Sequence, residues 1–402
     1  MLEGMGAKRK SLKKKMFEYN ESSLEYLTLD LGQANQKINM NSYYGASGLP
    51  VSAFYSQWSG PATTLTAQSV ISTTETAFEG FLSDNYLFLD FDEFVDWSKC
   101  VLSEEQDLDD FIRLISEEEL VQRLKNKFWK YKDEYEEMLR RFVSSLTITE
   151  RTRMYYKNNI RDFTKFHDEI RQLYYNVYSK IRNIPYAKTV DDIDPDIFKE
   201  FEEAKPKYNR EKTVKEFNSW VNMQRFLNPN EVPGTIKDDL QKLSDYYIKY
   251  CYVRYLVPDR IHRLKFFKRQ AVVIVDTDSN MLNCQPWVKF LEENVMQGET
   301  FDRDKNGNMF VGVNSIAYIL THMVTDILLW YGKKSNIPEK YRPKFNMKNE
   351  FLFIRLFIAK KKKRYLSSII LREGNLYDPV RIDEKGLDYK RSGTSQSCED
   401  YY

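Results

Sequence analysis

The stretch from Ala271 to Ser279, Ala-Val-Val-Ile-Val-Asp-Thr-Asp-Ser, constrains the fold of this chain more than any other. Its apolar, mostly β-branched residues predict a buried strand. Asp276 and Asp278 follow at alternate positions, so in an extended chain both carboxylates lie on one face and Thr277 on the other. Two like charges side by side are costly to bury unless a cation neutralises them.

A divalent cation is one group that could neutralise this pair. Mg²⁺ in proteins is typically held by one or two carboxylates together with substrate phosphates. The alternative is an ordinary hairpin turn, in which Asp and Ser are common. The stretch alone does not decide between a metal site and a turn, so the other motifs have to.

Composition argues against several classes of protein. The 402 residues, 42% of them hydrophobic, suffice for one large domain or about two to three smaller ones. The 4 cysteines form no Cys-x-x-Cys pair and the 3 histidines are scattered, which argues against a zinc site and indicates a reducing compartment. The start lacks the apolar core of a signal peptide. The apolar segment 311–331 contains His322 and Asp326, which favours a buried helix over a membrane span. We therefore expect a cytoplasmic or host-cell interior location, with no membrane partner.

Charge is strongly segregated along the chain, although the formal net charge is only +2. Residues 8–15 and 360–364 are basic runs, and 104–119 is acidic. Basic runs suit a polyanionic partner, but such runs are often only solvated faces.

The first part of the chain predicts a helical hairpin. Residues 2–19 form a basic helical segment, and in 24–44 the residues Leu24, Leu27, Leu31 and Ala34 recur near helical spacing. The polar run 20–23 suits a turn and a helix cap, so the two helices should pack antiparallel.

Three residues on the second helix share one face. Lys37, Asn41 and Tyr44 stand at i, i+4 and i+7. A lysine, an amide and an aromatic ring on one face could contact a phosphate, a sugar and a base. The alternative is an exposed polar face with Tyr44 as a core anchor.

A lysine-rich turn follows later in the chain. Residues 351–358 and 364–371 are apolar strand candidates, and 359–363 joins them with four lysines in succession. Such a turn is well placed to meet a phosphate backbone. The alternative is that its charges protect an aggregation-prone hairpin.

Four motifs in this order resemble those of family B DNA polymerases. Residues 37–45 resemble the K-x-x-x-N-S-x-Y-G motif, and 276–279 the D-T-D-S motif. Residues 363–365 resemble the end of the K-K-R-Y segment, and 385–392 the K-G-x-x-x-x-R-S that follows it. Each motif is moderately specific, and the ordered set is strong.

The resemblance implies a site for template-directed nucleotidyl transfer into DNA by two Mg²⁺ ions. Asp278 would be the main metal ligand and Asp276 its weaker companion. Arg9 and Lys37 would bind the triphosphate of the incoming nucleotide. Asn41 would assist them, and Tyr44 would pack under the nascent base pair. The DNA primer-template would be held by Lys361, Lys362, Lys363, Arg364 and Tyr365.

The expected fold class is α+β, with a right-hand polymerase fingers hairpin, a partial antiparallel palm sheet and a large helical insertion. We expect the fingers hairpin at 1–48 and a palm helix and strand at 49–92. An inserted helical subdomain should fill 93–268, and the palm with its D-T-D-S and K-K-R-Y hairpins 269–402. A second pair of alternating carboxylates, Asp90 and Asp92, follows an apolar run, but there we expect a helix N-terminus rather than a metal site.

One part of the family's site has no counterpart in these residues. The first metal-binding aspartate of the family lies upstream of the fingers in a D-x-x-S-L-Y-P strand, and a two-metal site needs carboxylates that bridge both ions. We therefore expect a second polymerase chain that carries this motif and the exonuclease. The thumb would come from another segment or chain, and the isolated chain should be inactive. A split gene of this kind would suit a virus or phage.

Two further interpretations stay open. The chain could be a non-catalytic DNA-binding or scaffolding subunit that kept the polymerase shape. It could also be the palm of an RNA polymerase or reverse transcriptase, although the ordered motifs match DNA polymerases more fully.

Overall fold

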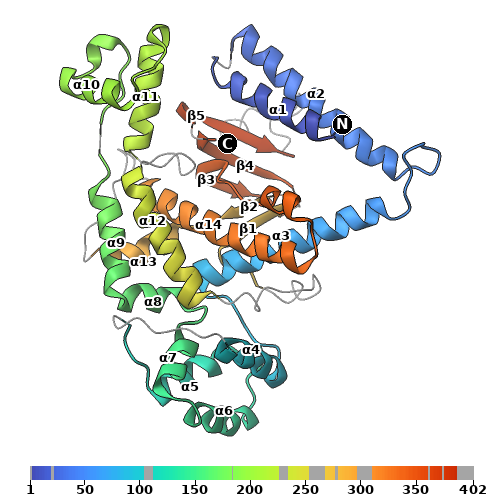
Figure 1. The fold of residues 1–402 in the computed structure, drawn as a ribbon, viewed down its shortest axis with the longest axis vertical. Coiled ribbons are helices and arrows are strands. Elements are labelled where there is room, and N and C mark those ends of the chain that lie inside the picture. Colours follow the sequence, from blue (N-terminus) through green and yellow to red (C-terminus); the bar gives the residue numbers. More distant parts are fainter. Residues whose placement is uncertain are drawn as a thin grey trace. The chain divides into compact units, whose positions relative to one another are not determined.

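The chain folds as an α+β protein in two compact units, Met1–Ile71 and Ser72–Tyr402, which are described separately (Figure 1). The computed structural model describes residues 2–19, 22–103, 112–182, 184–225, 234–252, 268–276, 279–296, 310–360, 363–373 and 375–386.

The first unit contains the predicted helical hairpin. Helix α1 covers Leu2–Met16 and α2 covers Leu24–Ser47, and the two helices pack against each other. Ser23 caps α2 by accepting a hydrogen bond from the Tyr26 amide at 3.1 Å. The helical spacing was predicted correctly but the buried face was not. Leu24, Leu27 and Leu31 are 76%, 50% and 67% exposed, whereas Met16 and Tyr26 are buried.

Helix α3, Ser59–Ser83, continues from the first unit into the second. In the second unit its small residues Ser72, Thr73, Thr74 and Thr76 are buried, as expected for a helix packed closely on a sheet. Thr74 Oγ1 accepts a hydrogen bond from Asn280 Nδ2 at 2.9 Å. This contact ties α3 to the hairpin that carries the D-T-D-S motif.

A buried carboxylate holds the start of that hairpin. Glu79 of α3 is fully buried. Its two oxygens accept hydrogen bonds from the backbone amides of Gln270, Ala271 and Val272, at 2.6 to 3.0 Å. Asn85 Nδ2 donates a further bond at 2.6 Å and also bonds the Lys268 carbonyl at 2.7 Å. Because the carboxylate is charged, these bonds are stronger than those between neutral groups.

Two antiparallel sheets are present in the second unit. Strands β1 (Val272–Asp276) and β2 (Ser279–Leu282) form the predicted hairpin, with Asp276 opposite Ser279. Strands β3 (Phe351–Ile358) and β4 (Tyr365–Arg372) match the second predicted hairpin. A third strand, β5 (Asn375–Lys385), completes the order β3-β4-β5 and was not predicted. It contains Pro379, which is tolerated because β5 is an edge strand.

Two described helices and a 3₁₀ segment lie between β2 and β3 in the chain. Helix α13 spans Gln285–Asn294, α14 spans Phe310–Lys334, and a 3₁₀ segment, η6, follows at Glu339–Lys344. Helix α14 is long and apolar enough to cross a membrane, but 67% of its most apolar window is buried inside the fold. That burial is what a core helix shows, as the sequence predicted.

The segment 93–268 is mainly helical, as predicted, and its described helices are short. Its described elements are α4 (Phe91–Ser103), α5 (Glu117–Lys125), α6 (Glu134–Ser144), α7 (Ile148–Tyr156), α8 (Ile160–Phe166), α9 (Asp168–Ser179), η1 (Val190–Asp192), α10 (Pro195–Ala204), η2 (Arg210–Lys212), α11 (Thr213–Gln224), α12 (Gly234–Tyr246) and the π-helical turn η3 (Tyr247–Cys251). Helices α7, α8 and α9 are separated at Asn158, whose φ is 57°, and at His167, which caps the start of α9.

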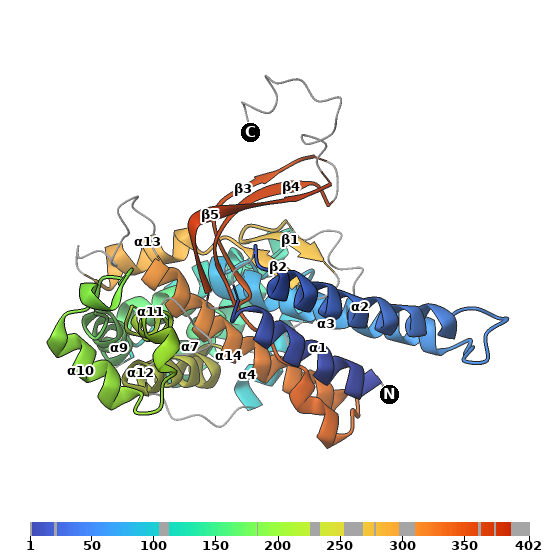
Figure 2. The same ribbon diagram turned by 90° about the horizontal axis from the view of Figure 1, so that it is seen from above.

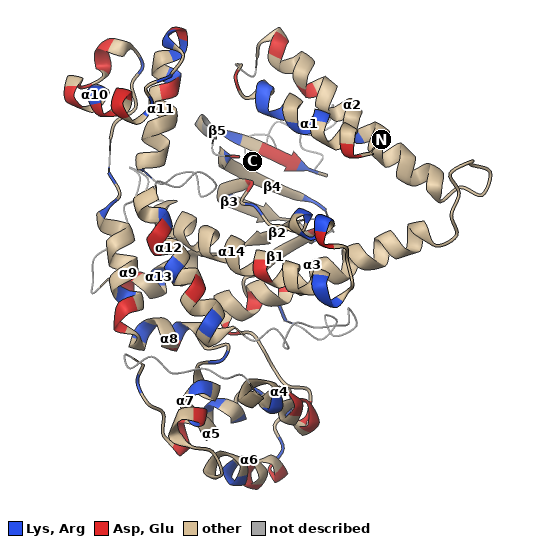
Figure 3. Ribbon diagram, viewed as in Figure 1, with Lys and Arg blue, Asp and Glu red and all other residues tan. Residues whose placement is uncertain are grey.

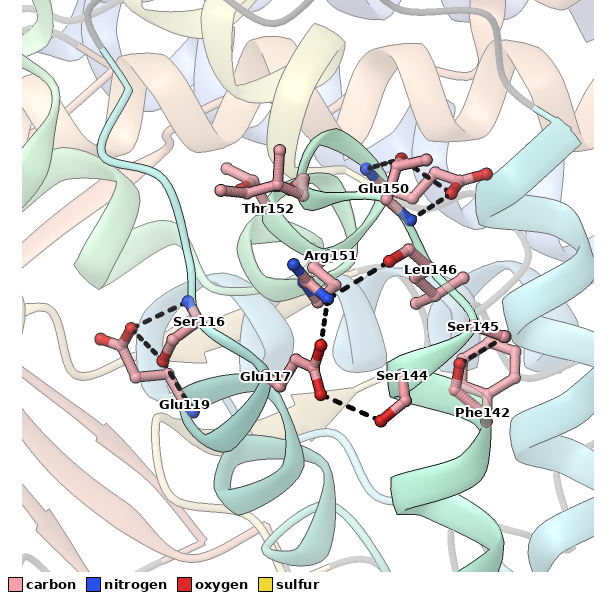
Figure 4. A network of polar contacts seen from close by, with 12 residues as sticks. Ser116, Glu117, Glu119, Phe142, Ser144, Ser145, Leu146, Glu150, Arg151 and Thr152 are labelled. Carbon is pink, nitrogen blue, oxygen red and sulfur yellow. Dashed lines mark hydrogen bonds and ion pairs between the residues drawn. The ribbon is translucent and has the colours of Figure 1, made fainter.

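Polar side chains fix the ends of these short helices (Figure 4). Ser116 and Glu119 form a capping box at α5, and Thr147 and Glu150 form another at α7. Glu117 joins the two ends, since it accepts hydrogen bonds from Arg151 at 2.7 Å and from Ser144 at 2.9 Å. These capping residues therefore set where α5 and α7 begin, although the surrounding sequence favours a longer helix.

The segment 93–268 packs on helix α3 within the second unit. Phe81 of α3 contacts Tyr247 of η3 and Trp287 of α13, with ring centroids 5.6 and 5.0 Å apart. Arg161 of α8 lies over the Trp287 ring at 5.4 Å and donates a hydrogen bond to the Leu82 carbonyl at 3.0 Å.

Residues 184–225 form a lobe with a core of its own. Its buried members are Ile184, Ala187, Ile193, Phe201, Phe217, Trp220 and Val221. Tyr186 packs against this core and also against the core of the β3-β4-β5 sheet, which contains Leu352, Ile370 and Leu371. Figure 3 shows that acidic residues gather on α10, on the outside of this lobe.

We predict that Glu79→Gln destabilises the second unit. The substituted amide removes the charge and turns a donor toward backbone amides, so the free energy of unfolding should fall by about 2–3 kcal/mol. Urea unfolding would measure this. Glu203→Gln, an exposed change on α10, is the control and should stay within about 0.5 kcal/mol of the wild type. Equal stability of the two variants would contradict the role given to Glu79.

Candidate functional site

The end of strand β1 places Asp276 beside the lysine turn. Lys363 Nζ lies 3.2 Å from Asp276 Oδ1, and the two side chains are 76% and 36% exposed. The fold therefore brings the D-T-D-S and K-K-R-Y segments together, although nearly ninety residues separate them in the sequence. In Figure 2 the β3-β4-β5 sheet lies beside the β1-β2 hairpin, as this contact requires.

Backbone geometry fixes the root of the Lys363 side chain. Lys363 has a φ of 61°, in the left-handed region that non-glycine residues seldom adopt. The Ala359 amide donates a hydrogen bond to the Arg364 carbonyl at 3.0 Å and so closes the turn. Gly386, with a φ of 63°, packs against the Lys363 carbonyl. A Cβ at Gly386 would lie only 2.7 Å from that oxygen, so the close approach requires glycine.

A second lysine, on strand β5, lies at the corner where Asp276 meets Lys363. Lys385 is the cross-strand partner of Tyr365, and its Nζ lies 5.6 Å from the centre of the Tyr365 ring. The pKa of Lys385 is raised, chiefly by its hydrogen bond to Tyr365 and to a smaller extent by the negative charge of Asp276. Tyr365 itself is buried, so its ring gives Lys385 a fixed support.

The charge balance of this corner favours an anion. Lys363, Lys385 and the neighbouring Arg364 supply three positive charges against the carboxylates of Asp276 and Asp383. Arg364 follows in the same turn and is half-buried. An excess of cationic side chains on a partly exposed strand end is suited to a phosphodiester backbone.

The first unit holds the other predicted site residues. Arg9 of α1 donates a hydrogen bond from Nε to Gln33 Oε1 of α2 at 3.2 Å. Gln33 stands one helical turn before Lys37, so Arg9 joins the face of α2 that carries Lys37. Lys37 and Asn41 are both exposed. Figure 3 shows further basic residues along α1.

Tyr44 ends this face and is tied to the next helix. Its hydroxyl lies 2.9 Å from Thr64 Oγ1 and donates to the Gly60 carbonyl at 3.4 Å, both on α3. The ring stays 46% exposed, so it is not the buried core anchor of the alternative interpretation.

Several predicted residues lie outside the described part of the chain. They are Asp278, Lys361 and Lys362, together with Arg391 and Ser392 of the last motif. The second carboxylate pair, at Asp90, is a helix N-terminus as expected. Asp90 Oδ1 accepts a hydrogen bond from the Glu93 amide at 2.9 Å, and Glu93 accepts one from the Leu89 amide at 2.6 Å.

The described residues fit one position of a magnesium site without completing it. Asp276 offers carboxylate oxygens, which Mg²⁺ prefers, but its Oδ1 faces Lys363. Among the described residues, no three His, Cys, Asp or Glu side chains lie together in a way that could hold a metal ion. Further ligands would have to come from Asp278 and from a carboxylate outside the described residues.

Two contributors to the site were missed by sequence reasoning. Lys385 was noted only as part of a motif, and Glu79 was not singled out at all. The sequence did contain a signal for Lys385. If the chain after Tyr365 forms two antiparallel strands, the second strand brings Lys385 back opposite Tyr365. Glu79 gave no signal beyond being a charged residue in a helix of small and apolar ones.

Comparison with known proteins supports the motif resemblance. The family model described as Divergent Family B DNA polymerase matches residues 1–401. The match therefore spans all four motifs and the insertion between them. No curated protein and no solved structure gave a match.

We predict that Gly386→Ala loosens this corner. The added Cβ meets the Lys363 carbonyl and the left-handed backbone is strained, which together should cost more than about 1 kcal/mol. Hydrogen exchange of β4 and β5 amides would report the loss locally. Gly4→Ala is the control, because a Cβ there meets no heavy atom within 4 Å, and exchange should be unchanged. Unchanged protection in Gly386→Ala would mean that the turn adapts.

Proposed function

The chain belongs to the divergent family B DNA polymerases, and we propose that it supplies the fingers and the second half of the palm of a DNA-directed DNA polymerase. The observation that carries this proposal is the corner at which three separate motif segments meet: Asp276, Lys363 and the pair Lys385–Gly386. The reaction would be template-directed nucleotidyl transfer, in which most of the catalysis is positioning and charge neutralisation.

The first unit would bind the incoming deoxynucleoside triphosphate. Arg9 and Lys37, brought to one face by the Arg9–Gln33 hydrogen bond, would hold the triphosphate. Asn41 lies one turn further and would assist. Tyr44, whose hydroxyl is fixed by Thr64, would present its exposed ring under the nascent base pair.

The second unit would hold the primer-template and the metal. Lys363 and Tyr365, with Lys361, Lys362 and Arg364, would contact the DNA near the primer end. Asp278 and Asp276 would contribute carboxylates to a two-Mg²⁺ site. When bound, such ions neutralise the charge on the attacking and leaving oxygens.

A second polypeptide would complete the site. The 402 residues contain no counterpart of the family's first metal-binding aspartate, and among the described strands β1 pairs only with β2. An open strand edge is a ready place for another chain to pair. We propose that a partner adds a D-x-x-S-L-Y-P-like strand there and carries the exonuclease. An obligate interface of this kind buries on the order of 2,000 Å² or more. The thumb would come from another segment or chain.

A second candidate function is a non-catalytic DNA-binding or scaffolding subunit. The observation that favours it is the pairing of Asp276 with Lys363, together with the lack of a three-ligand group among the described residues. The two candidates differ in whether Asp278 is needed for synthesis.

We predict that Asp278→Ala abolishes DNA synthesis by the reconstituted complex and leaves its assembly intact. The change removes the proposed metal ligand and only a small side chain. Primer extension with Mg²⁺ and size-exclusion chromatography would measure the two properties. Asp92→Ala is the matched control, because Asp92 belongs to the other pair of alternating carboxylates and is exposed at the start of α4.

Two outcomes would contradict this reading. Equal synthesis by the Asp278→Ala complex would favour the scaffolding function. Robust extension by the pure chain, abolished by Asp278→Ala, would show that the missing carboxylate is supplied internally and that no partner strand is needed.

We predict that replacing Lys361, Lys362 and Lys363 by Ala weakens DNA binding and its dependence on salt. Each lost phosphate contact should lower the log–log salt slope by about 0.9 for duplex DNA. Fluorescence anisotropy over a salt series would measure the slope. Removing three exposed lysines from the α10 lobe, Lys188, Lys199 and Lys207, is the charge-matched control. Equal slopes for both variants would mean that the turn only solubilises the hairpin.

A further inference from the structure

Lys363 has a constrained backbone and a largely exposed side chain. Its left-handed φ and the packing of Gly386 on its carbonyl hold the backbone in place. Its side chain is 76% exposed and meets Asp276 through a single 3.2 Å contact. An exposed ion pair of this kind is weak and exchanges readily. The Lys363 ammonium can therefore move to another anion within reach of the side chain while the backbone of Lys363 keeps its position.

The Asp276 carboxylate has a second cation that remains when the first leaves. Lys385 is held on the Tyr365 ring and interacts electrostatically with Asp276. Departure of Lys363 would therefore remove one competing positive charge from Oδ1, while Lys385 stays nearby. A divalent cation would meet less competition for the carboxylate in that state.

We propose that Lys363 is shared between Asp276 and DNA: it covers the carboxylate in the DNA-free protein and moves to a backbone phosphate when a primer-template binds. One ammonium cannot neutralise both groups fully, so phosphate and carboxylate compete for it. DNA binding then removes one cation that competes for Asp276, which favours a divalent cation there, and by linkage the cation strengthens DNA binding by the same factor. This inference rests on the proposed function, because it takes DNA as the ligand of the corner.

A double-mutant cycle without metal tests the competition. DNA affinity would be measured in EDTA, by anisotropy with a recessed-end primer-template, for wild type, Asp276→Asn, Lys363→Gln and the double variant. Asp276→Asn frees Lys363, so it should tighten DNA binding by about two- to fivefold beyond its effect in the Lys363→Gln background, the range expected for an exposed ion pair. Lys363→Gln alone should weaken binding.

A matched control separates competition from general charge effects. Lys360→Gln removes a charge from the same turn, and no contact with Asp276 is described for Lys360. In that background Asp276→Asn should keep its full gain. An equal gain from Asp276→Asn in the wild-type and Lys363→Gln backgrounds would overturn the proposal, as would unchanged DNA affinity in Lys363→Gln.

A second measurement tests the predicted linkage. In the 402-residue chain, Mn²⁺ should tighten DNA binding by the wild type and have a smaller effect on Lys363→Gln, in which the lysine no longer competes for Asp276. An equal effect of Mn²⁺ on both would overturn the coupling. The cycle in EDTA involves no synthesis, so the shared-lysine proposal can fail while Asp278→Ala still abolishes synthesis. The reverse result, synthesis that survives Asp278→Ala, would instead remove the proposed function.

Discussion

The buried carboxylate of Glu79 is the interaction on which the candidate site depends. It bonds three consecutive backbone amides at the start of β1 and so fixes the strand to helix α3 before the strand reaches Asp276. Thr74 holds the returning strand to the same helix through Asn280. The hairpin is short, and a two-stranded ribbon has little stability alone. Its position therefore comes from side chains of α3 rather than from a wide sheet.

The opposite side of the corner is built by backbone shape. Two residues with positive φ, Lys363 and Gly386, lie against each other and bring the ends of β4 and β5 close to β1. The result is the Asp276 carboxylate with Lys363 and Lys385 beside it. The side chains are exposed enough to change partners, and the backbone of the turn is constrained enough to keep their positions. This arrangement suits reversible binding of an anion, because the exposed Asp276–Lys363 ion pair is weak.

How much of this the sequence predicts depends on whether the signal is local. The apolar runs of β1, β3 and β4 and the helical spacing of α2 are local, and they were predicted within a few residues. The buried face of α2 was not, since its exposed leucines mimic a core stripe. Strand β5 was missed because Pro379 and its polar residues resemble a loop, and only pairing with β4 makes it a strand. The capping residues of the short helices in 93–268 can be recognised in the sequence. Whether a cap ends a helix or the helix continues through it cannot be decided from local propensity. Long-range contacts, such as those of Glu79 and Lys385, have no local pattern.

Tyr186 joins the 184–225 lobe to the β3-β4-β5 sheet. Its ring packs in the core of the 184–225 lobe and also in the core beneath the β3-β4-β5 sheet, and Arg225 lies 4.6 Å above it. Burial raises the pKa of its hydroxyl, which donates a hydrogen bond to Asn222. One ring therefore contributes to the packing of both the lobe and strands β3 and β4. Removing this ring would take contacts from both cores at once, so the lobe and the sheet should lose stability together.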